Sequence, residues 1–519
     1  MTTQPEPEMV KASSKVRPLG ELATIAARAR KEGKAVVLAH GVFDLLHHGH
    51  IRHLEAGRRE GDVLVVTVTA DRFVDKGPDR PVFAAEVRAE TLASLEIVDY
   101  VGINDAASAE PAIHALKPAV YLKGSEYARE EDDVTGKITG ERGAVEEHGG
   151  RIVFTDEIVF SASALINRHL DVYEPELRDY LEERREGGRY LERALEAIEG
   201  IADLRVLLVG DAIVDEYSYV SALGKSWKEN IITTLHKSDE AFAGGVFAAA
   251  NHVAGFCREV EILTALGEGD PYEELVRGSL KPNVTLTPLY RSGVPTTRKR
   301  RFVEQSYFRK LFEVYYMDDT ALADGQRIEL DRLIAERAGE YDLVIVTDFG
   351  HGLIGGATVE VLRRDSRFLA VNAQTNSGNQ GFNLITKYPS ADYMCLDAPE
   401  ARLAAGDKRG DIDRVLRDGL ATRIDCPRFI VTNGDHGCAV YEPDRPLRMI
   451  PAFTRTVVDT IGAGDAFLAV TSPLAASGIP LDMAGFIGNA VGALKVGIVG
   501  HRSSVEKPQL VKYITSLLK

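Results

Sequence analysis

Two histidines three positions apart are the residues of this sequence best suited to phosphate chemistry. His47 and His50 flank Gly49, and the segment 41–50 reads Gly-Val-Phe-Asp-Leu-Leu-His-His-Gly-His. An apolar run typical of a strand, 35–39, precedes the segment, and helical periodicity follows it. A strand, a glycine turn and a helix start bring backbone N–H groups and two imidazoles to one point. That arrangement suits a polyphosphate, because helix N-termini favour anions and imidazoles can donate to phosphate oxygens.

The same region offers an alternative, a cluster that binds a transition metal. Its members would be the five histidines His40, His47, His48, His50 and His53. Helical spacing of three could allow such a site, but no carboxylate or cysteine joins the histidines at a fitting distance.

A glycine turn that opens a helix near the C-terminus is the second chemical signal. The segment 458–467 reads Val-Asp-Thr-Ile-Gly-Ala-Gly-Asp-Ala-Phe. Consecutive N–H groups at Gly462, Ala463 and Gly464 would form an anion hole for a transferring phosphoryl group. Asp465, in the same turn, is placed to accept a proton from an attacking hydroxyl as a general base.

Strand and helix patterns alternate on both sides of a charged segment, which predicts an α/β fold with two doubly wound domains. The expected divisions are a disordered tail at 1–20, a first domain at 21–172, a charged helical linker at 173–200 and a second domain at 201–519. Expected strands lie at 35–39, 63–68, 100–103, 119–122 and 151–154, and then at 205–209, 260–263, 343–347, 368–372, 393–396 and 429–432.

Composition limits the functional classes that fit this chain. Its 519 residues exceed one ordinary core, and 45% hydrophobic and 27% charged residues are typical of a globular protein. A formal net charge of −16 argues against nucleic acid as a partner. No apolar stretch reaches the roughly 18–20 residues that a membrane helix needs, and the polar N-terminus lacks the apolar core of a signal peptide. We expect a cytoplasmic protein with no membrane partner.

The first half resembles the cytidylyltransferase-like nucleotidyltransferases over residues 34–170. Within them it is most similar to the adenylyltransferase domain of the bifunctional heptose-phosphate kinase/adenylyltransferases, and the implied fold is a Rossmann-like domain. The motifs that carry the resemblance follow one another in order. They are Gly41-Val42-Phe43-Asp44 with His47-x-Gly49-His50, Lys76-Gly77-Pro78-x-Arg80, Glu86-x-Arg88, Tyr121-Leu122-Lys123-Gly124 and Phe160-Ser161-Ala162-Ser163.

This resemblance implies in-line attack of a sugar phosphate on the α-phosphate of an NTP, with release of pyrophosphate. His47 and His50 would hold the transferring phosphate and the leaving group, and Mg²⁺ is the expected counter-charge. The resemblance implies that further residues contact the nucleotide: Lys76 and Arg88 on the polyphosphate, Ser161 and Ser163 at a helix N-terminus, and Gly41, Val42, Phe43, Asp44 and Lys123. Lys123 could instead be only a surface lysine.

The second half resembles the ribokinase/PfkB carbohydrate kinases over residues 204–505. The motif of 459–467 implies that Asp465 is the general base. On the sugar side the resemblance implies contacts from Asp211, Asp215, Gly244, Gly245 and Asp348. On the ATP side it implies Asn433, Gly434, Gly437 and Asn489, with Gly462 to Gly464 as the anion hole and Glu400 linked to Mg²⁺.

Several positions depart from the kinase pattern. Ala248 stands where the family has a sugar-contacting Asn, Asp397 replaces the Asn of Asn-x-x-Glu, and 371–374 reads Val-Asn-Ala-Gln instead of ending in Asp-Pro-Lys. Catalytic residues are kept while sugar-facing ones differ, which favours a different substrate. The basic run 298–301 could contact a phosphate, although a solvated strand edge is the simpler interpretation.

Together the two resemblances imply a bifunctional enzyme that makes an NDP-activated, heptose-like sugar, linked to ADP or CDP, for glycan biosynthesis. ATP would serve the kinase, and ATP or CTP the nucleotidyltransferase. The domain order is reversed relative to the heptose enzymes, which puts heptose itself in doubt. A phosphatase acting between the two steps is implied as a partner, and a homodimer is a family-level expectation.

Two other hypotheses remain open. In the first, only the nucleotidyltransferase is active and the kinase-like domain binds a regulatory ligand. In the second, the chain is a nucleotide-sensing interaction protein without turnover, which two intact catalytic motifs disfavour.

Overall fold

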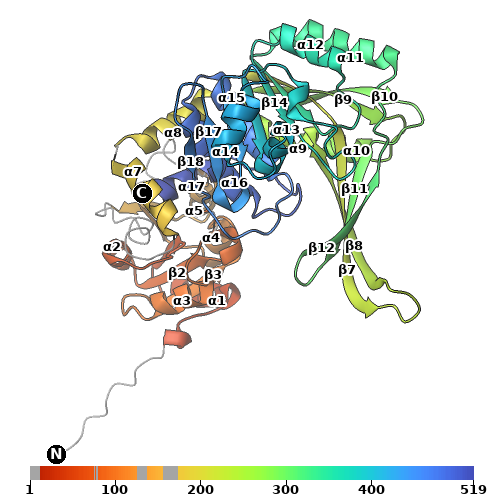
Figure 1. Ribbon diagram of the computed structural model, residues 1–519. Helices are drawn as coiled ribbons and strands as arrows, with labels where there is room; N and C mark the ends of the chain where they lie inside the picture. The colour runs from red at the N-terminus through yellow and green to blue at the C-terminus, as the bar shows by residue number, and fades with distance from the viewer. Residues whose placement is uncertain (1–11, 75, 78–79, 125–136, 156–172, 187) are drawn as a thin grey trace, which may run out of the picture. The chain divides into compact units, whose positions relative to one another are not determined.

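Residues 12–74, 76–77, 80–124, 137–155, 173–186 and 188–519 are described by the computed structural model (Figure 1). The chain divides into two units. The first comprises Met1–Pro175 with Val511–Lys519, and the second comprises Glu176–Leu510. Each unit has its own mainly parallel sheet with helices on its faces, so the predicted α/β fold is confirmed.

The first unit contains a five-stranded parallel sheet in the order β3-β2-β1-β4-β5. Its strands follow the five predicted apolar runs: β1 (Val36–Gly41), β2 (Val63–Thr69), β3 (Tyr100–Asn104), β4 (Val120–Gly124) and β5 (Arg151–Thr155). Chain order reverses between β1 and β4. Ligands of such sheets bind outside the carboxyl ends of the strands at this switch point, and the histidine segment follows β1 there.

Helices cover both faces of this sheet. They are α1 (Leu19–Lys31), α2 (His48–Arg59), α3 (Ala85–Ala93), α4 (Glu110–Leu116) and α5 (Ile138–Glu147). One core gathers Leu54 of α2 and Leu92 of α3 against the sheet, and the other gathers Leu22 of α1 and Ile113 of α4. Because both faces are covered, the strands are nearly continuous apolar runs, as parallel sheets require.

The second unit contains a nine-stranded sheet in the order β10-β9-β6-β13-β14-β15-β16-β17-β18, of which only the last two strands run antiparallel to their neighbours. The strands are β6 (Arg205–Gly210), β9 (Glu259–Gly267), β10 (Val284–Arg291), β13 (Leu343–Asp348), β14 (Leu369–Ala373), β15 (Tyr393–Asp397), β16 (Phe429–Thr432), β17 (Cys438–Tyr441) and β18 (Arg448–Ile450). The six strands predicted here are all present, as β6, β9, β13, β14, β15 and β16.

The remaining described helices belong to the second unit, apart from Pro175 at the start of α7 and the part of α17 from Val511, which belong to the first. They are α7 (Pro175–Glu186), α8 (Tyr190–Gly200), α9 (Val246–Ala254), α10 (Glu273–Ser279), α11 (Asp324–Arg337), α12 (Gly356–Asp365), α13 (Ala398–Ala405), α14 (Ile412–Arg414), α15 (Ala463–Ala476), α16 (Leu481–Lys495) and α17 (Lys507–Leu518). Two of them, α15 and α16, are apolar on almost all sides, because both lie in the interior.

A second, four-stranded sheet in the order β12-β11-β7-β8 extends from the larger one, and its β7–β8 hairpin projects furthest (Figure 1). Its strands are β7 (Ala212–Lys225), β8 (Ile232–Gly245), β11 (Thr297–Glu304) and β12 (Arg309–Tyr316). The basic run 298–301 lies in β11, between β7 and β12. The interpretation of this run as a solvated strand edge is therefore wrong, because β11 is paired on both sides.

Across the described residues, every helix is too short or too polar to cross a membrane.

Candidate active sites

The histidine turn of the first unit brings two imidazoles together at the start of α2. His47 is the N-cap residue of α2 and His50 lies in its first turn, with their ring centroids 3.9 Å apart. Both Nδ1 atoms are buried and have no hydrogen-bond partner within the described structure. Burial, assisted by neighbouring positive charge, lowers the pKa of His47 and lowers that of His50 to about 3. Both rings are therefore neutral near pH 7, each with one N–H available as a donor.

Asp44 and Arg88 organise the backbone around this turn. The Asp44 carboxylate accepts the N–H of Val82 at 2.8 Å and also faces Arg80 at 3.2 Å. Arg88 is almost fully buried, and its guanidinium donates to the carbonyls of Val42, Phe83 and Thr69 and to Asp71. With most of its N–H groups engaged, Arg88 fits a positioning role better than the direct polyphosphate contact expected from the sequence.

Two lysines lie on the same unit with different surroundings. Burial and the charge of Arg80 lower the pKa of Lys76, as expected for a cation held close to other cations. Lys123 lies in β4, and its Nζ is 2.8 Å from Glu141 with the side chain only 13% exposed. The alternative that Lys123 is merely a surface lysine is therefore wrong. Ser161 and Ser163 lie outside the described residues.

The metal-cluster alternative for the histidine segment finds no support in the described part of the chain. His40 pairs with Thr67 and His53 with Thr155, at 2.9 and 2.7 Å, so both are tied to the sheet. Among described residues, the one group with three ligand atoms within reach of one another is His114, Glu147 and His148, which is away from the histidine turn in sequence.

The glycine turn of the second unit precedes α15 as predicted. Gly462 is the N-cap residue in the left-handed region, with φ of 74°, a conformation that glycine adopts without strain. A side chain at this position would also collide with the ring of His501. Asp465 follows in the first helical turn, where N–H groups lack intrahelical acceptors. The turn therefore combines backbone donors with a carboxylate.

Asp465 is only 7% exposed, and burial raises its pKa above the ordinary value. The side chain of Gln374 donates to its Oδ1 at 2.7 Å and opposes this shift. A buried carboxylate with a raised pKa accepts a proton more readily than an exposed one, which suits a general base.

A cavity of about 680 Å³ opens over this turn. Its lining includes the whole stretch Thr460–Asp465, together with Gly434 and Gly437. Asn433 lies in sequence between two lining residues, and Asn489 lines the cavity while its amide group holds the carbonyls of Ile450 and Pro451. The volume falls in the range of small-molecule and cofactor sites.

The sugar-side residues expected from the sequence cluster at the ends of β6, β7, β8 and β13. Asp211 accepts the N–H of Phe349 at 2.8 Å, and burial together with the charge of Asp348 raises its pKa to about 6. Asp348 is held by Lys387 and Tyr388, each at 2.7 Å. These two acids are thus fixed by their neighbours.

Asp215 is the most strongly paired acid of the group. It forms a buried ion pair with Arg301 of β11, and His501 Nε2 lies 3.3 Å from its other oxygen. Burial alone would raise the pKa of Asp215, but His501 and Arg301 together hold it well below its usual range. Gly244 and Gly245 fit here because a Cβ on Gly244 would collide with the Asp215 carboxylate.

Glu400 and Asp397 form a capping box at the start of α13. Asp397 accepts the N–H of Glu400 at 2.7 Å, and Glu400 accepts the N–H groups of Asp397 and Thr375. Burial and the charge of Asp397 raise the pKa of Glu400 to about 8. Crowded carboxylate oxygens that line the cavity are the donor type that Mg²⁺ prefers, so these residues fit a magnesium ion by their chemistry.

Sequence reasoning missed several residues of this region. Arg301 is one of several basic residues in the run 298–301, and nothing in the sequence distinguishes it from the others. Gln374 lies at a position where the sequence departs from the family pattern, so the resemblance assigned it no role. His351 is nearly buried with both ring nitrogens unpartnered in the described structure, and only its place after Asp348 could have pointed to it. The fourth and fifth, His501 and Lys495, lie after the recognised motifs.

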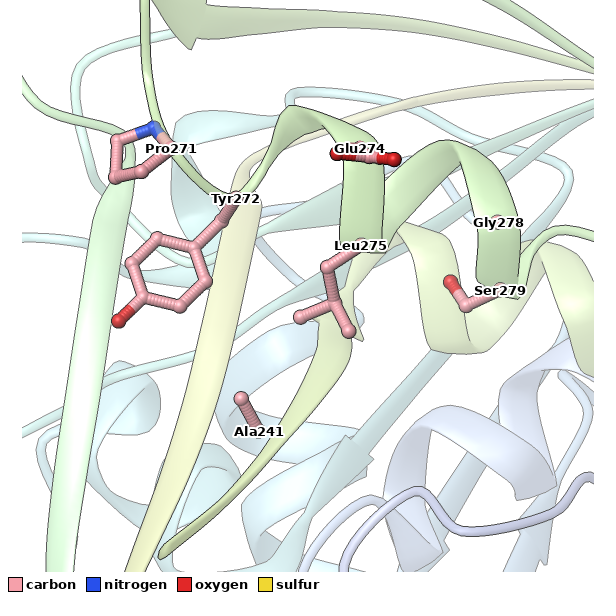
Figure 2. Close-up of a pocket in the computed structure, with 7 residues that line it drawn as sticks. All are labelled: Ala241, Pro271, Tyr272, Glu274, Leu275, Gly278 and Ser279. Atoms are coloured by element: carbon pink, nitrogen blue, oxygen red, sulfur yellow. The ribbon is translucent and has the colours of Figure 1, made fainter.

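A further cavity of about 580 Å³ lies between α10 and β8. In Figure 2, Tyr272 and Leu275 lie over Ala241, with Pro271 and Ser279 at the sides. None of the residues that line this cavity was predicted to belong to the nucleotidyltransferase site or to the kinase site.

Two family models match this chain. Residues 38–168 match the cytidylyltransferase-like model, and residues 368–508 match the pfkB family carbohydrate kinase model. A segment similar to the cytidylyltransferase-like family thus precedes a segment similar to the pfkB-family carbohydrate kinases. Both families consist of transferases, and the two resemblances found in the sequence are confirmed.

Curated relatives match the N-terminal part. A bifunctional protein HldE from Syntrophotalea carbinolica is 38% identical over 164 residues, which are 31% of this chain and 32% of the relative. A protein of the same name from Geobacter sulfurreducens is 40% identical over 141 residues, 27% of each chain. The chain thus spans about a third or less of the length of these relatives.

Among solved structures, phosphofructokinase-2 from Escherichia coli resembles this chain with a TM-score of 0.50 and 13% identity. The likeness covers 61% of this chain and all of the other. At this identity it shows a shared fold and nothing of the substrate.

Proposed function

We propose that the chain is a bifunctional sugar kinase and sugar-1-phosphate nucleotidyltransferase. The observation that carries the proposal is the pairing of two complete phosphate-handling turns on one chain, at the starts of α2 and α15. Each turn follows a strand or loop that a family model matches. Consecutive use of one sugar by both sites would yield an NDP-activated, heptose-like sugar for glycan assembly.

In the kinase reaction, a sugar hydroxyl attacks the γ-phosphorus of ATP. Asp465 accepts the hydroxyl proton, the new O–P bond forms, and the bond to the β-phosphate breaks to release ADP. The turn holds the transferring phosphoryl group by the N–H groups of Gly462 and Gly464, which are fixed before the reaction begins, while the N–H of Ala463 donates to the carbonyl of Thr460. Mg²⁺ held near Glu400 would neutralise phosphate charge when bound.

In the nucleotidyl transfer, an oxygen of a sugar 1-phosphate attacks the α-phosphorus of ATP or CTP, and pyrophosphate leaves. The attacking phosphate is already ionised, so no general base is required. Neutral His47 and His50 can donate N–H groups to the phosphate oxygens while Lys76 offsets the charge of the leaving group. This division of work fits a turn whose buried acid, Asp44, is already engaged by Arg80 and by the N–H of Val82.

A second candidate keeps the nucleotidyltransferase active and makes the kinase-like part a sensor for a sugar ligand. The pairing of Asp215 with Arg301 and His501 favours it, because the acid that should bind sugar hydroxyls is already engaged. Against it stands the ordered turn with Asp465 and Gln374.

A mass-spectrometric product screen tests the proposal. The full chain is incubated with sugars, sugar 1-phosphates and sugar 7-phosphates, with ATP or CTP and Mg²⁺. A phosphorylated sugar from one reaction and an NDP-sugar from another are the expected products. An NDP-sugar without phosphorylation of any acceptor would favour the sensor, and neither product would contradict the proposal.

A further inference from the structure

Lys495, the last residue of α16, has a completely buried side chain. An ammonium group without hydrogen-bond acceptors would be very costly in such a place. Its Nζ donates to the carbonyl of Ile461 and to the carbonyl of Gly500, both at 2.7 Å. Ile461 immediately precedes Gly462, so this fixed positive charge lies directly behind the anion-hole turn.

Asp459 complements Lys495 at the same two residues. Its carboxylate accepts the N–H of Ile461 at 3.1 Å and the N–H of Gly500 at 2.8 Å. Both polar backbone groups of Ile461 and of Gly500 are therefore bound by buried side chains of opposite charge. The segment around Ile461 and the segment around Gly500 are therefore linked twice, by Lys495 through their carbonyl groups and by Asp459 through their N–H groups.

The other contacts of Asp459 extend this arrangement into the four-stranded sheet. Tyr217 of β7 donates to the carboxylate at 2.6 Å, and Lys310 of β12 donates at 2.5 Å. Asp459 thus retains a cationic partner and an O–H donor even without Lys495. The carbonyls of Ile461 and Gly500, in contrast, both accept hydrogen bonds from the ammonium group of Lys495.

The segment held with Gly500 carries His501 next in the chain. The ring of His501 lies against Gly462, and its buried Nδ1 is unpartnered within the described structure while Nε2 faces Asp215. A displacement of Gly500 would therefore move an imidazole that lies between the sugar-side acid and the phosphate-side turn. Small displacements of this kind matter, because catalytic groups must stay within about 0.5 Å of their productive positions.

We propose that Lys495 is a positioning residue for phosphoryl transfer. Its ammonium group holds the turn from Ile461 to Gly464 and the adjacent His501 in the geometry that receives the transferring phosphoryl, and places fixed positive charge behind that group. The inference rests on the proposed kinase function. It adds that the anion hole is not complete with its glycines alone and depends on a charge supplied from α16.

The electrostatic surroundings agree with this role. Burial lowers the pKa of Lys495 to about 8, while Asp459, Asp465 and Asp215 oppose the shift and Lys310 adds to it. The charge of Lys495 in turn opposes part of the increase that burial causes in the pKa of Asp465. Its neighbours also include His252, whose pKa burial and Lys495 lower.

The test compares Lys495→Met, Lys495→Ala and the control Lys408→Met in the full chain. Lys408 is an exposed lysine of the same unit, so its change should be neutral. Two quantities are measured: kcat and KM for phosphoryl transfer to the best acceptor, and the ratio of the affinities for a non-hydrolysable ATP analogue and for ADP. The affinity ratio measures how strongly the protein binds the γ-phosphate, and it can be measured without a sugar acceptor.

We expect Lys495→Met to lower kcat about 100-fold, as for loss of one donor to a transition-state anion, with a much smaller change of KM. The preference for the ATP analogue over ADP should disappear. In Lys495→Ala, added propylammonium should restore part of kcat and part of the preference for the ATP analogue. The reason is that it can place an ammonium group between the carbonyls of Ile461 and Gly500. Lys408→Met should behave as wild type.

Wild-type kcat and wild-type nucleotide preference in Lys495→Met would overturn the inference. So would unfolding of both Lys495 variants that propylammonium does not reverse, because the lysine would then be structural only. If the wild-type protein transfers no phosphoryl group, the proposed function fails, and the nucleotide-affinity ratio still decides the role of Lys495.

Discussion

The turn before α2 and the turn before α15 both stand at a helix N-terminus, yet they present different groups to a phosphate. The first presents the side chains of His47 and His50, neutral and close together. The second presents backbone N–H groups, with Asp465 in the turn and Lys495 behind it. The difference follows from the nucleophile: a phosphate needs no base, whereas a hydroxyl must lose a proton.

This comparison predicts the largest effect for Asp465→Asn. The variant removes the proton acceptor and keeps the shape of the side chain, so phosphoryl transfer should fall about 1,000-fold. Nucleotidyl transfer by the same sample should not change. Steady-state assays of ADP formation and of pyrophosphate release measure the two rates, and an equal loss in both would break the proposed division.

Replacement of His47 by Ala is the reciprocal change. Loss of one donor to the transferring phosphate should lower nucleotidyl transfer about 100-fold, with phosphoryl transfer unaffected. His48→Ala is the matched control, because His48 is the next residue and is exposed. If His48→Ala were as harmful as His47→Ala, the loss would reflect the helix start and not the imidazole.

Arg301→Met sharpens the comparison by removing the ion-pair partner of Asp215, a buried acid of the second site. Asp215 would lose its buried guanidinium partner, so the free energy of unfolding of the second unit should fall by about 3 kcal/mol at pH 7. Thermal unfolding measures the loss, with exposed Arg309→Met as the control.

The pH dependence of that loss gives a second check. The folded-state pKa of Asp215 is depressed, so its contribution to stability is present above the unfolded value of about 4 and is lost as pH falls further. The difference between Arg301→Met and wild type should therefore shrink below about pH 4. A difference that grows on acidification would contradict the assignment.

The smallest expected effect is a shift of a pH profile. Gln374 donates to Asp465 and lowers its pKa, so Gln374→Ala should raise that pKa. The acidic limb of kcat/KM for the kinase should move to higher pH, since the hydrogen bond from Gln374 stabilises the ionised carboxylate of Asp465. An unchanged limb would show that another group limits the rate at low pH.

Much of the architecture could be predicted, because buried parallel strands such as Val63–Thr69 and Leu343–Asp348 are continuous apolar runs bounded by turns. The four-stranded sheet could not. Its β11 reads Thr-Arg-Lys-Arg-Arg-Phe-Val-Glu, and its alternating burial depends on partners far away in sequence. Periodicity alone cannot reveal that Arg301 is buried when the charge that compensates it lies on β7.

The same distinction applies to the sites. The turns of His47 and Asp465 are local, so a few consecutive residues predict both the backbone and the chemistry. The roles of Arg88 and Lys495 depend on carbonyls contributed by distant segments, and a sequence gives no sign of which carbonyls a cation will meet. Motif residues are therefore predictable from sequence, and the groups that hold them in place are not.

The most direct test of the central claim is a crossed assay of both half-reactions in wild type, Asp465→Asn and His47→Ala, prepared side by side as full chains. Two separate sites on one chain predict that Asp465→Asn loses only sugar phosphorylation and that His47→Ala loses only NDP-sugar formation. If either variant loses both products while remaining folded, or loses neither, the chain does not contain two independent transfer sites at these turns.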